Sequence, residues 1–251
     1  MSADATPENA RVSTDTVTPS APKRPMSPYD HAFLTNIEGV TEVYLVRHGE
    51  QQLDGAVTAG ELVDPPLSAR GRRQAELVGD RFKSEQIDVV YSSHLLRAHD
   101  TGKAIAGHHG LDPIIEPELR EIEVFRDVPQ SQTPLDAIGR LQLLGMRHRM
   151  QTEKRWDAYG YSESSAAFHA RVVTTIEGII AEHVGQRIVI ACHGGVISMY
   201  TGHLLRLQED MWFRPGHTSV NLVRAKGTVR AIDFVGDLHH LKQADPALVS
   251  Y

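Results

Sequence analysis

The sequence predicts an α/β fold in which most strands of the central sheet are parallel. From about residue 40 onward, strand-like and helix-like stretches alternate, which is typical of α/β proteins. Residues 43–46 form a short apolar run rich in β-branched and aromatic side chains, as in a buried parallel strand. A second apolar run at 187–192 has the same character, and both runs end abruptly at histidine and glycine. Open α/β sheets bind their ligands at the carboxyl ends of such strands, so we expect the functional site there.

Caps and hydrophobic spacing predict the other elements. Ser68 is a typical N-cap, and the stretch that follows it carries apolar residues at helical spacing. Phe168, Val172 and Ile176 recur at the spacing of one helix face. In chain order we expect a strand at 43–46, a helix at 68–82, a strand at 87–91, a helix at 94–108, a short strand at 114–115, helices at 135–156 and 162–183, a strand from 188, a helix at 196–205, and strands at 219–224 and 229–234.

The chain divides into a tail and one domain. Residues 1–28 are rich in Ser, Thr, Ala, Pro and Asp with balanced charges, which predicts a disordered N-terminal tail. Residues 40–241 hold the alternating pattern and predict a single domain, because a chain of 251 residues can bury one sizeable core. Within this domain, residues 125–161 break the pattern: they contain a predicted helix whose lysines and arginines outnumber its acids.

Composition limits the partners. The formal net charge of −6 gives no basic field for nucleic acid. No apolar run is long enough to span a membrane, and no apolar segment follows a basic start. Cys192 is the only cysteine, so no internal disulfide forms, and it is expected to be a buried apolar side chain rather than a nucleophile. We therefore expect a cytoplasmic protein with a small-molecule substrate and no nucleic-acid or membrane partner; the sequence leaves open whether it forms a homodimer.

The residues after the first strand suit covalent catalysis on an anion. Arg47 can direct a forked pair of donors onto oxyanions, His48 can be a nucleophile, and Gly49 lets the backbone approach closely. After the second strand, His193 and Gly194 precede a predicted helix, whose N-terminal N–H groups favour an anion.

Two further segments complete the set of candidate residues. Arg97 lies one turn into the predicted helix at 94–108, which follows the predicted strand at 87–91, and Glu121 is a carboxyl group next to Arg120 in the segment 117–122. Adjacent histidines at 108–109 and 239–240 point in different directions on any regular element, and no histidine pair has the spacing and nearby acid of a metal site. We therefore predict no metal site and no cofactor.

Taken together, these motifs resemble the histidine phosphatase superfamily, also called phosphoglycerate mutase-like. The resemblance runs from about residue 40 to 241 and implies a three-layer α/β/α fold with a mostly parallel central sheet. The motifs that carry it are Arg47-His48-Gly49-Glu50, the stretch 66–75 (PLSARGRRQA), Ser92-Ser93 with Arg97-Ala98, Leu119-Arg120-Glu121, His193-Gly194-Gly195 and the closing stretch 235–241 (VGDLHHL).

By this resemblance, His48 would be the phosphorylated histidine, and Arg47, Arg97 and His193 would hold the phosphoryl oxygens. Glu121 matches the acid that protonates the leaving oxygen in the phosphatase branches. Family members usually carry a threonine or serine soon after the first glycine and an asparagine six residues past the nucleophile, where this chain has Gln51 and Asp54. An ionised aspartate would repel a phosphoryl group, so whether Gln51 or Asp54 contacts substrate stays open.

The expected activity is that of a metal-independent phosphomonoester hydrolase with a phosphohistidine intermediate and a small phosphorylated substrate. Two alternatives remain. Mutases of this family carry a Glu-Arg-His-Tyr-Gly stretch at the acid position, where this chain has Glu121-Ile122-Glu123-Val124-Phe125. A non-catalytic binding module on the same fold would be expected to lose His48, Arg97 or Glu121, and all three are present. By resemblance, the insertion at 125–161 is a lid that selects substrates; the competing interpretation is a solvated helix that covers the core.

Overall fold

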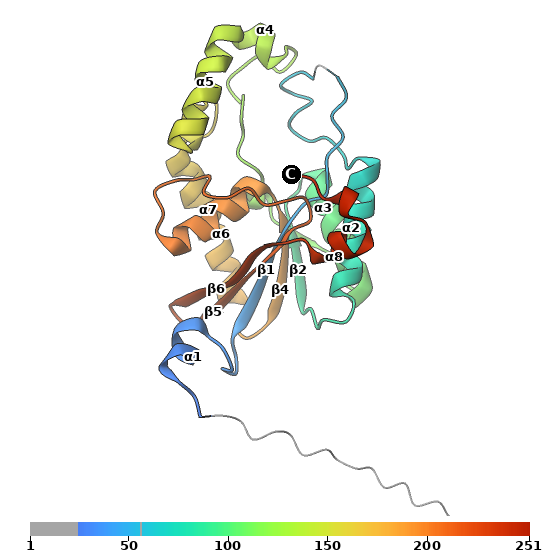
Figure 1. The fold of residues 1–251 in the computed structure, drawn as a ribbon, viewed down its shortest axis with the longest axis vertical. Helices are drawn as coiled ribbons and strands as arrows, with labels where there is room; N and C mark the ends of the chain where they lie inside the picture. The colour runs from blue at the N-terminus through green and yellow to red at the C-terminus, as the bar shows by residue number, and fades with distance from the viewer. Residues whose placement is uncertain (1–24, 56) are drawn as a thin grey trace, which may run out of the picture.

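The protein is a three-layer α/β/α sandwich with an arm of two helices above one edge of the sheet (Figure 1). The computed structural model describes residues 25–55 and 57–251. Helices α6 and α7 cover one face of the central sheet, and α2 and α3 cover the other (Figure 1). The predicted fold class is thus confirmed.

The described elements follow the order that the sequence predicts, with additions at both ends. The strands are β1 (Thr41–Arg47), β2 (Val89–Ser92), β3 (Ile114–Ile115), β4 (Arg187–Cys192), β5 (Val220–Lys226) and β6 (Val229–Asp237). The helices are α1 (Pro28–Phe33), α2 (Ala69–Phe82), α3 (Leu96–Ala106), α4 (Pro134–Ile138), α5 (Arg140–Glu153), α6 (Ser165–Glu182), α7 (Gly194–Leu205) and α8 (His239–Ala244), with short 3-10 turns η1 (Gly107–His109), η2 (Pro117–Leu119), η3 (Trp156–Ala158) and η4 (Pro246–Leu248).

The sheet has the strand order β3-β2-β4-β1-β5-β6. Its first four strands pair in parallel, whereas β5 pairs antiparallel with both β1 and β6. The register places Arg47, the last residue of β1, opposite Cys192, the last residue of β4. Both predicted strand ends therefore lie side by side at one edge of the sheet. Because β5 runs the opposite way, it begins at this same edge.

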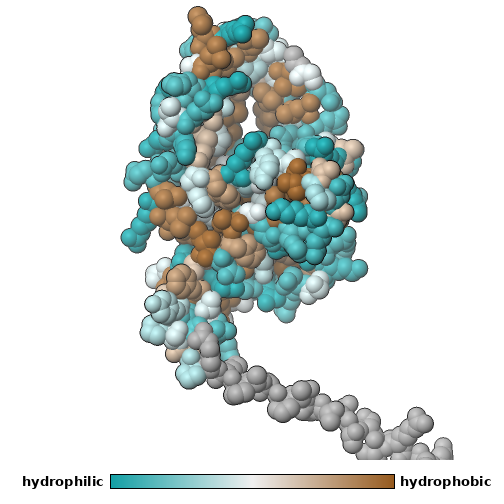
Figure 2. Space-filling model, viewed as in Figure 1, coloured by the Kyte–Doolittle hydropathy of each residue, from teal (hydrophilic) through white to brown (hydrophobic). Residues whose placement is uncertain are grey.

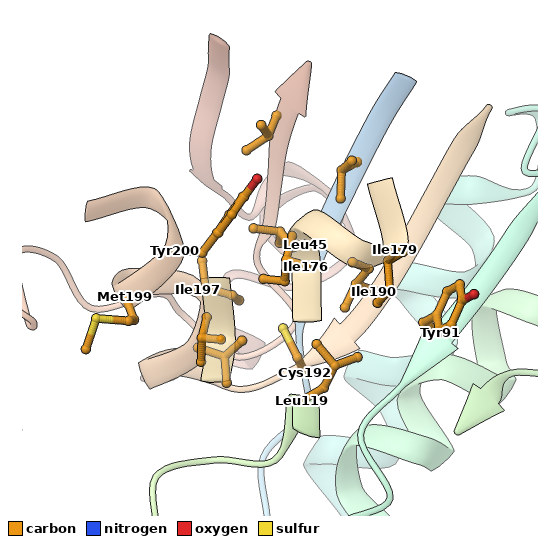
Figure 3. Packing of buried hydrophobic residues seen from close by; sticks show 14 of the residues in the cluster. Leu45, Tyr91, Leu119, Ile176, Ile179, Ile190, Cys192, Ile197, Met199 and Tyr200 are labelled. Carbon is orange, nitrogen blue, oxygen red and sulfur yellow. The ribbon is translucent and has the colours of Figure 1, made fainter. Parts of the chain in front are cut away.

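Alternation along β1 builds two cores. Val43 and Leu45 face α6 and α7, while Tyr44 and Val46 face α2 and α3. Figure 3 shows the first core, in which Leu45 and Ile190 from the sheet meet Ile176 and other helix residues. Val43, Leu45, Val46 and all of β4 after its first residue are buried, which matches the continuous apolar runs expected of central strands.

Local signals explain where the helices begin. Ser68 caps α2 by accepting a hydrogen bond from the Gly71 N–H, as predicted. The long helix starts at Ser165 rather than 162, because Ser164 is the residue that caps it. Helix α1 was not predicted; it begins at Pro28 with a reciprocal capping box between Ser27 and Asp30. Residues 1–24 of the predicted tail at 1–28 lie outside the described residues.

The insertion at 125–161 folds differently from the prediction of one helix at 135–156. Gly139, with a φ of 87°, separates α4 from α5, and the chain leaves the helix at Lys154. Met146 is the only residue of α5 that is fully buried, while Leu135, Leu141 and Leu144 are exposed. Figure 2 shows hydrophobic surface at the tip of this arm. A membrane-spanning segment is absent from the described residues, whose helices are too short or too polar to traverse a bilayer.

Candidate active site

The structure brings all of the predicted site residues to the edge of the sheet where β1 and β4 end. The His48 N–H donates to the Cys192 carbonyl at 2.9 Å, which ties the two strand ends together. The imidazole rings of His48 and His193 lie 5.1 Å apart between centroids. Arg97, in the first turn of α3, reaches His48 directly. A parallel sheet thus converts three separate sequence motifs into one cluster.

The hydrogen bonds of His48 identify its reactive nitrogen. The Arg97 Nε–H lies 3.3 Å from Nε2 of His48, and arginine has only donors, so Nε2 is the acceptor. The proton of a neutral ring therefore lies on Nδ1, which donates to the Gly49 carbonyl at 2.7 Å. Burial lowers the pKa of His48 well below its usual range, and the positive charge of Arg97 lowers it further. His48 is thus neutral at neutral pH, with the lone pair of Nε2 facing the cluster.

Two arginines supply positive charge near His48: Arg97, which is buried, and Arg47, which is partly buried. The Arg97 guanidinium also donates to the Val63 carbonyl at 3.1 Å, and Asp64 lies 3.8 Å from it. The Arg47 guanidinium donates to the Pro215 carbonyl at 2.6 Å, while its Nε is buried and has no partner. Burial lowers the pKa of Arg47 to about 10, so it is still a cation at neutral pH. These fixed charges can hold the oxygens of an anion.

His193 caps α7 at the second strand end. Its side chain is fully buried, and neither ring nitrogen has a hydrogen-bond partner. Burial lowers the pKa of His193 well below its usual range, with Arg97 the next contributor. Leaving a buried polar group without a hydrogen-bond partner costs free energy. A buried imidazole without partners is typical of a site in which a bound ligand supplies the missing hydrogen bond. A side chain at Gly194 would touch the Arg47 Nε at 3.4 Å, so this glycine keeps the backbone close to the guanidinium.

Glu121 lies beside the start of α7. Its two carboxylate oxygens each accept one backbone N–H, from Ile122 at 3.1 Å and from Gly195 at 3.0 Å. The negative charge of Glu121 acts on Arg47 and Arg97, raising the pKa of each against the larger effect of burial. Glu121 is therefore within electrostatic range of both guanidinium groups.

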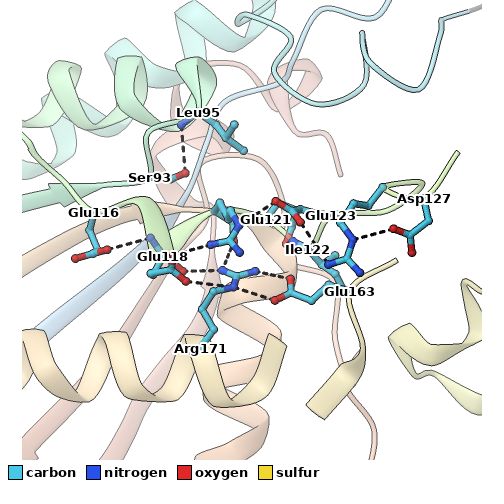
Figure 4. Close-up of polar contacts among 12 residues, drawn as sticks. Ser93, Leu95, Glu116, Glu118, Glu121, Ile122, Glu123, Asp127, Glu163 and Arg171 are labelled. Atoms are coloured by element: carbon cyan, nitrogen blue, oxygen red, sulfur yellow. Dashed lines mark hydrogen bonds and ion pairs between the residues drawn. The ribbon is translucent and has the colours of Figure 1, made fainter. Parts of the chain in front are cut away.

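A buried ion pair holds the segment that carries Glu121. Arg171 on α6 donates to the carbonyls of Glu118 and Arg120 at 2.6 and 2.9 Å (Figure 4). The same guanidinium makes a bidentate pair with Glu163, at 3.1 and 2.7 Å, and both side chains are 7% exposed. Such a pair fixes geometry as well as adding energy. Arg171 therefore clamps the 118–121 segment onto α6 and sets the place of the acid.

His217 is a member of the cluster that sequence reasoning missed. Its ring lies 5.7 Å from that of His48, and its Nε2 lies 3.0 Å from an Arg47 nitrogen. The residue precedes β5, which was predicted as a strand but not as an antiparallel neighbour of β1. The polar Arg214-Pro215-Gly216-His217 stretch before that strand was the available signal, because an antiparallel strand begins where its parallel neighbours end.

Hydrogen bonds join the 125–161 insertion to the loop after Glu50. The Ala59 and Gly60 N–H groups donate to the carbonyls of Gln132 and Gln130 at 2.8 and 3.0 Å. At the base of the arm, Trp156 stacks on Tyr159, and Phe125 packs edge-on against Tyr159. A Cβ on Gly195 would lie 3.1 Å from the Trp156 ring, so an aromatic wall borders Glu121.

Other predicted positions have plain structural roles. Cys192 is buried in the first core, and burial raises the pKa of its thiol, which confirms the prediction of an apolar role. Asp54 is exposed and accepts a hydrogen bond from Gln52, while Oε1 of Gln51 is buried without a partner. Within residues 25–55 and 57–251, no three His, Cys, Asp or Glu side chains gather closely enough to hold a metal ion.

The model of the histidine phosphatase superfamily (branch 1) matches residues 43–237. The protein belongs to this superfamily. The match covers most of the chain and includes every residue assigned above to the cluster. The resemblance stated from the motifs is thereby confirmed.

Named relatives in this superfamily include both phosphatases and mutase-like proteins. Phosphoglycerate mutase-like protein 4 of Arabidopsis thaliana is 31% identical over 219 residues, which covers 80% of this chain and 87% of that protein. The metal-independent phosphoserine phosphatase of the same plant is 30% identical over 217 residues, covering 80% and 84%. Among solved structures, YhfR of Bacillus stearothermophilus has a TM-score of 0.68 at 23% identity, covering 80% of this chain and 99% of that one. This last likeness supports the fold.

Proposed function

We propose that this protein is a metal-independent phosphomonoester hydrolase that acts through a phosphohistidine on Nε2 of His48. One observation carries the proposal: a buried, neutral His48 presents Nε2 to the buried guanidinium group of Arg97, and the partly buried Arg47 cation acts on the same ring. That arrangement combines a nucleophile with positive charge fixed around the atom it attacks. The phosphatase and mutase names of its relatives support an enzyme that acts on phosphate esters.

In the proposed reaction, Nε2 of His48 attacks phosphorus in line with the ester oxygen. The bond from nitrogen to phosphorus forms as the ester bond breaks, and Glu121, which must be protonated when the substrate binds, gives its proton to the leaving oxygen. Arg97 now donates to Nε2, so it must turn from this lone pair to the phosphoryl oxygens when substrate binds. Arg47 and His193 add their unpartnered donors, and the Gly49 carbonyl stabilises the proton on Nδ1.

The second step returns the enzyme to its starting state. Glu121, now a carboxylate, removes a proton from water, which attacks the phosphohistidine and releases inorganic phosphate. The fixed cations Arg47 and Arg97 neutralise the charge that spreads over the equatorial oxygens. The chain's own residues thus supply the roles that the reaction needs, and the substrate is a small phosphorylated molecule that enters beneath the arm.

A phosphomutase is the second candidate, because one relative bears a phosphoglycerate mutase-like name. In that reaction a second hydroxyl group, rather than water, would accept the phosphoryl group. The Glu121-Ile122-Glu123-Val124-Phe125 stretch differs from that expected of mutases, which favours hydrolysis. Product analysis separates the two: a hydrolase releases inorganic phosphate without an added acceptor, and a mutase returns an isomeric phosphate ester.

The decisive experiment measures phosphate release from a panel of phosphomonoesters with EDTA present. We expect turnover in the wild-type protein and a loss of at least about 10³-fold in His48→Ala, because the nucleophile is gone. Rapid quenching should trap an acid-labile, base-stable phosphoryl group on His48. Activity of His48→Ala within about tenfold of wild type, or activity that zinc or magnesium restores after chelation, would overturn the proposal.

A further inference from the structure

The Arg47 guanidinium is oriented by two acceptors of the protein. One terminal nitrogen donates to the Pro215 carbonyl at 2.6 Å, and the other lies 3.0 Å from Nε2 of His217. Arginine has five N–H donors in a rigid plane, so fixing both ends of the fork fixes the direction of the rest. The buried Nε, which has no partner, faces Gly194 at the start of α7. His217 is the side-chain member of this pair of acceptors.

The contacts of His217 determine its tautomer. Because arginine can only donate, Nε2 of His217 must accept, and the proton of the neutral ring lies on Nδ1. Nδ1 in turn lies 2.9 Å from the Ser250 hydroxyl oxygen, which accepts that proton's hydrogen bond. Burial lowers the pKa of His217 to about 3, with Arg47 the next contributor, so the ring stays neutral beside the guanidinium.

The segment at 248–250 is also linked, through Gln74, to the stretch that carries Arg47 and His48. Gln74 on α2 is fully buried and donates to the Leu248 carbonyl at 2.6 Å and to the Ser250 hydroxyl at 3.0 Å. Its carbonyl oxygen accepts the Glu50 N–H at 2.8 Å. The His217 N–H also donates to the Ser250 carbonyl at 2.9 Å. Figure 1 places this end of the chain near the edge of the sheet where the cluster lies.

We propose that His217 and Ser250 are positioning residues for catalysis: Ser250 fixes the His217 ring, and His217 aims the Arg47 guanidinium at the phosphoryl group. The segment at 248–250 is then a structural part of the phosphate pocket. This inference rests on the proposed function, since it assigns a task to Arg47. A purely structural histidine would contribute to folding, whereas this one changes how tightly the pocket holds a phosphoryl group.

Two substitutions at His217 separate its acceptor from its bulk. In His217→Gln, the amide oxygen can take the place of Nε2 and keep the Arg47 contact. In His217→Leu, the volume is kept and the acceptor is lost. His183→Leu is the matched control, because His183 is also bonded through both ring nitrogens, to Tyr91 and Gln186, but lies at the opposite edge of the sheet. Each variant is assayed for kcat, KM, melting temperature and competitive inhibition by orthovanadate.

We expect His217→Leu to lower kcat/KM by roughly 10- to 100-fold, the scale on which a misplaced catalytic group costs rate, and to weaken vanadate inhibition similarly. His217→Gln should stay within about threefold of wild type, and His183→Leu should change melting temperature alone. Ser250→Ala should lower kcat/KM by about fivefold, the factor that one hydrogen bond carries. Ser250→Ala and His217→Gln decide the question if His217→Leu does not fold.

The inference is overturned if His217→Leu turns over substrate and is inhibited by orthovanadate as wild type is. It is also overturned if His217→Gln loses as much activity as His217→Leu, or if Ser250→Ala leaves kcat/KM unchanged. These results concern the variants only. A wild-type protein that neither releases phosphate nor binds vanadate would instead overturn the proposed function, and the inference with it.

Discussion

Gly195 offers a direct structural test of Glu121 without changing the acid itself. A Cβ at this position would lie 2.3 Å from Oε1 of Glu121 and 3.1 Å from Cζ2 of Trp156. An ordinary contact of such a carbon begins at 3.4 Å, so in Gly195→Ala the carboxyl group must retreat by roughly 1 Å. Trp156 narrows the directions in which it can move. The obstacle is the end of a flexible side chain, so the fold should accept the methyl group.

A displacement of this size is expected to cost about 10² in the rate of a step that needs Glu121. Departure of an alkoxide needs its proton, whereas departure of p-nitrophenolate hardly does. We therefore expect Gly195→Ala to lower kcat/KM by about 100-fold for an alkyl phosphate and by less than about threefold for p-nitrophenyl phosphate. The ratio kcat/KM is the suitable quantity, because it reports only the steps up to departure of the leaving group and not the later attack by water.

Gly178→Ala is the control for helix effects. Gly178 lies in α6, is exposed, and has no atom near the position of a Cβ. Alanine favours a helix over glycine by up to about 1 kcal/mol, so neither variant should melt below wild type. If Gly195→Ala lowers kcat/KM equally for both esters, or leaves kcat/KM for the alkyl ester unchanged, Glu121 is not the group that protonates the leaving oxygen.

Three further predictions concern Arg97, metal dependence and the buried histidines. Arg97→Ala should lower kcat/KM by about 10² or more, measured by steady-state kinetics, because it removes a preorganised cation. EDTA should leave turnover unchanged, and inhibition that added metal reverses would contradict this. The pKa values of His48, His193 and His217 are lowered in the folded protein, so only the unfolded chain binds their protons below pH 6.5. Stability is therefore full above about pH 7.5 and falls as the pH drops through 6.5: from about pH 7.5 to about pH 5.5, urea titrations should show a loss of about 1.4 kcal/mol for each of the three. A flat profile would contradict this.

Much of the candidate site could be predicted because its residues directly follow strands that are recognisable from their own local sequence. The apolar run before Arg47 and the one before His193 are strands by their own composition, and parallel pairing brings their ends to one edge of the sheet. Arg97 followed from its place in the first turn of the next helix. The alternating pattern was enough to predict the fold class, since each element carries its own periodicity.

The helical boundaries were predicted less well where a single residue decided them. Gly139 divides the predicted 135–156 helix because its φ is positive, and no periodicity reveals such a break. Ser164 rather than Ser162 caps the long helix, although both are suitable residues by type. These choices depend on the path of the chain around each cap.

The sequence by itself determined the fold class, the segment with the candidate nucleophile and the second histidine, because each is a property of one strand and the residues that follow it. Only the tertiary structure decided how these residues are aimed. His217 meets Arg47 across 170 residues of chain because β5 runs antiparallel and begins where β1 ends. Ser250 reaches the same point through Gln74, and Trp156 borders Glu121 because Asp210 accepts a hydrogen bond from its backbone N–H. Contacts between such distant segments depend on the direction of strands and the return of the chain, which no local pattern encodes.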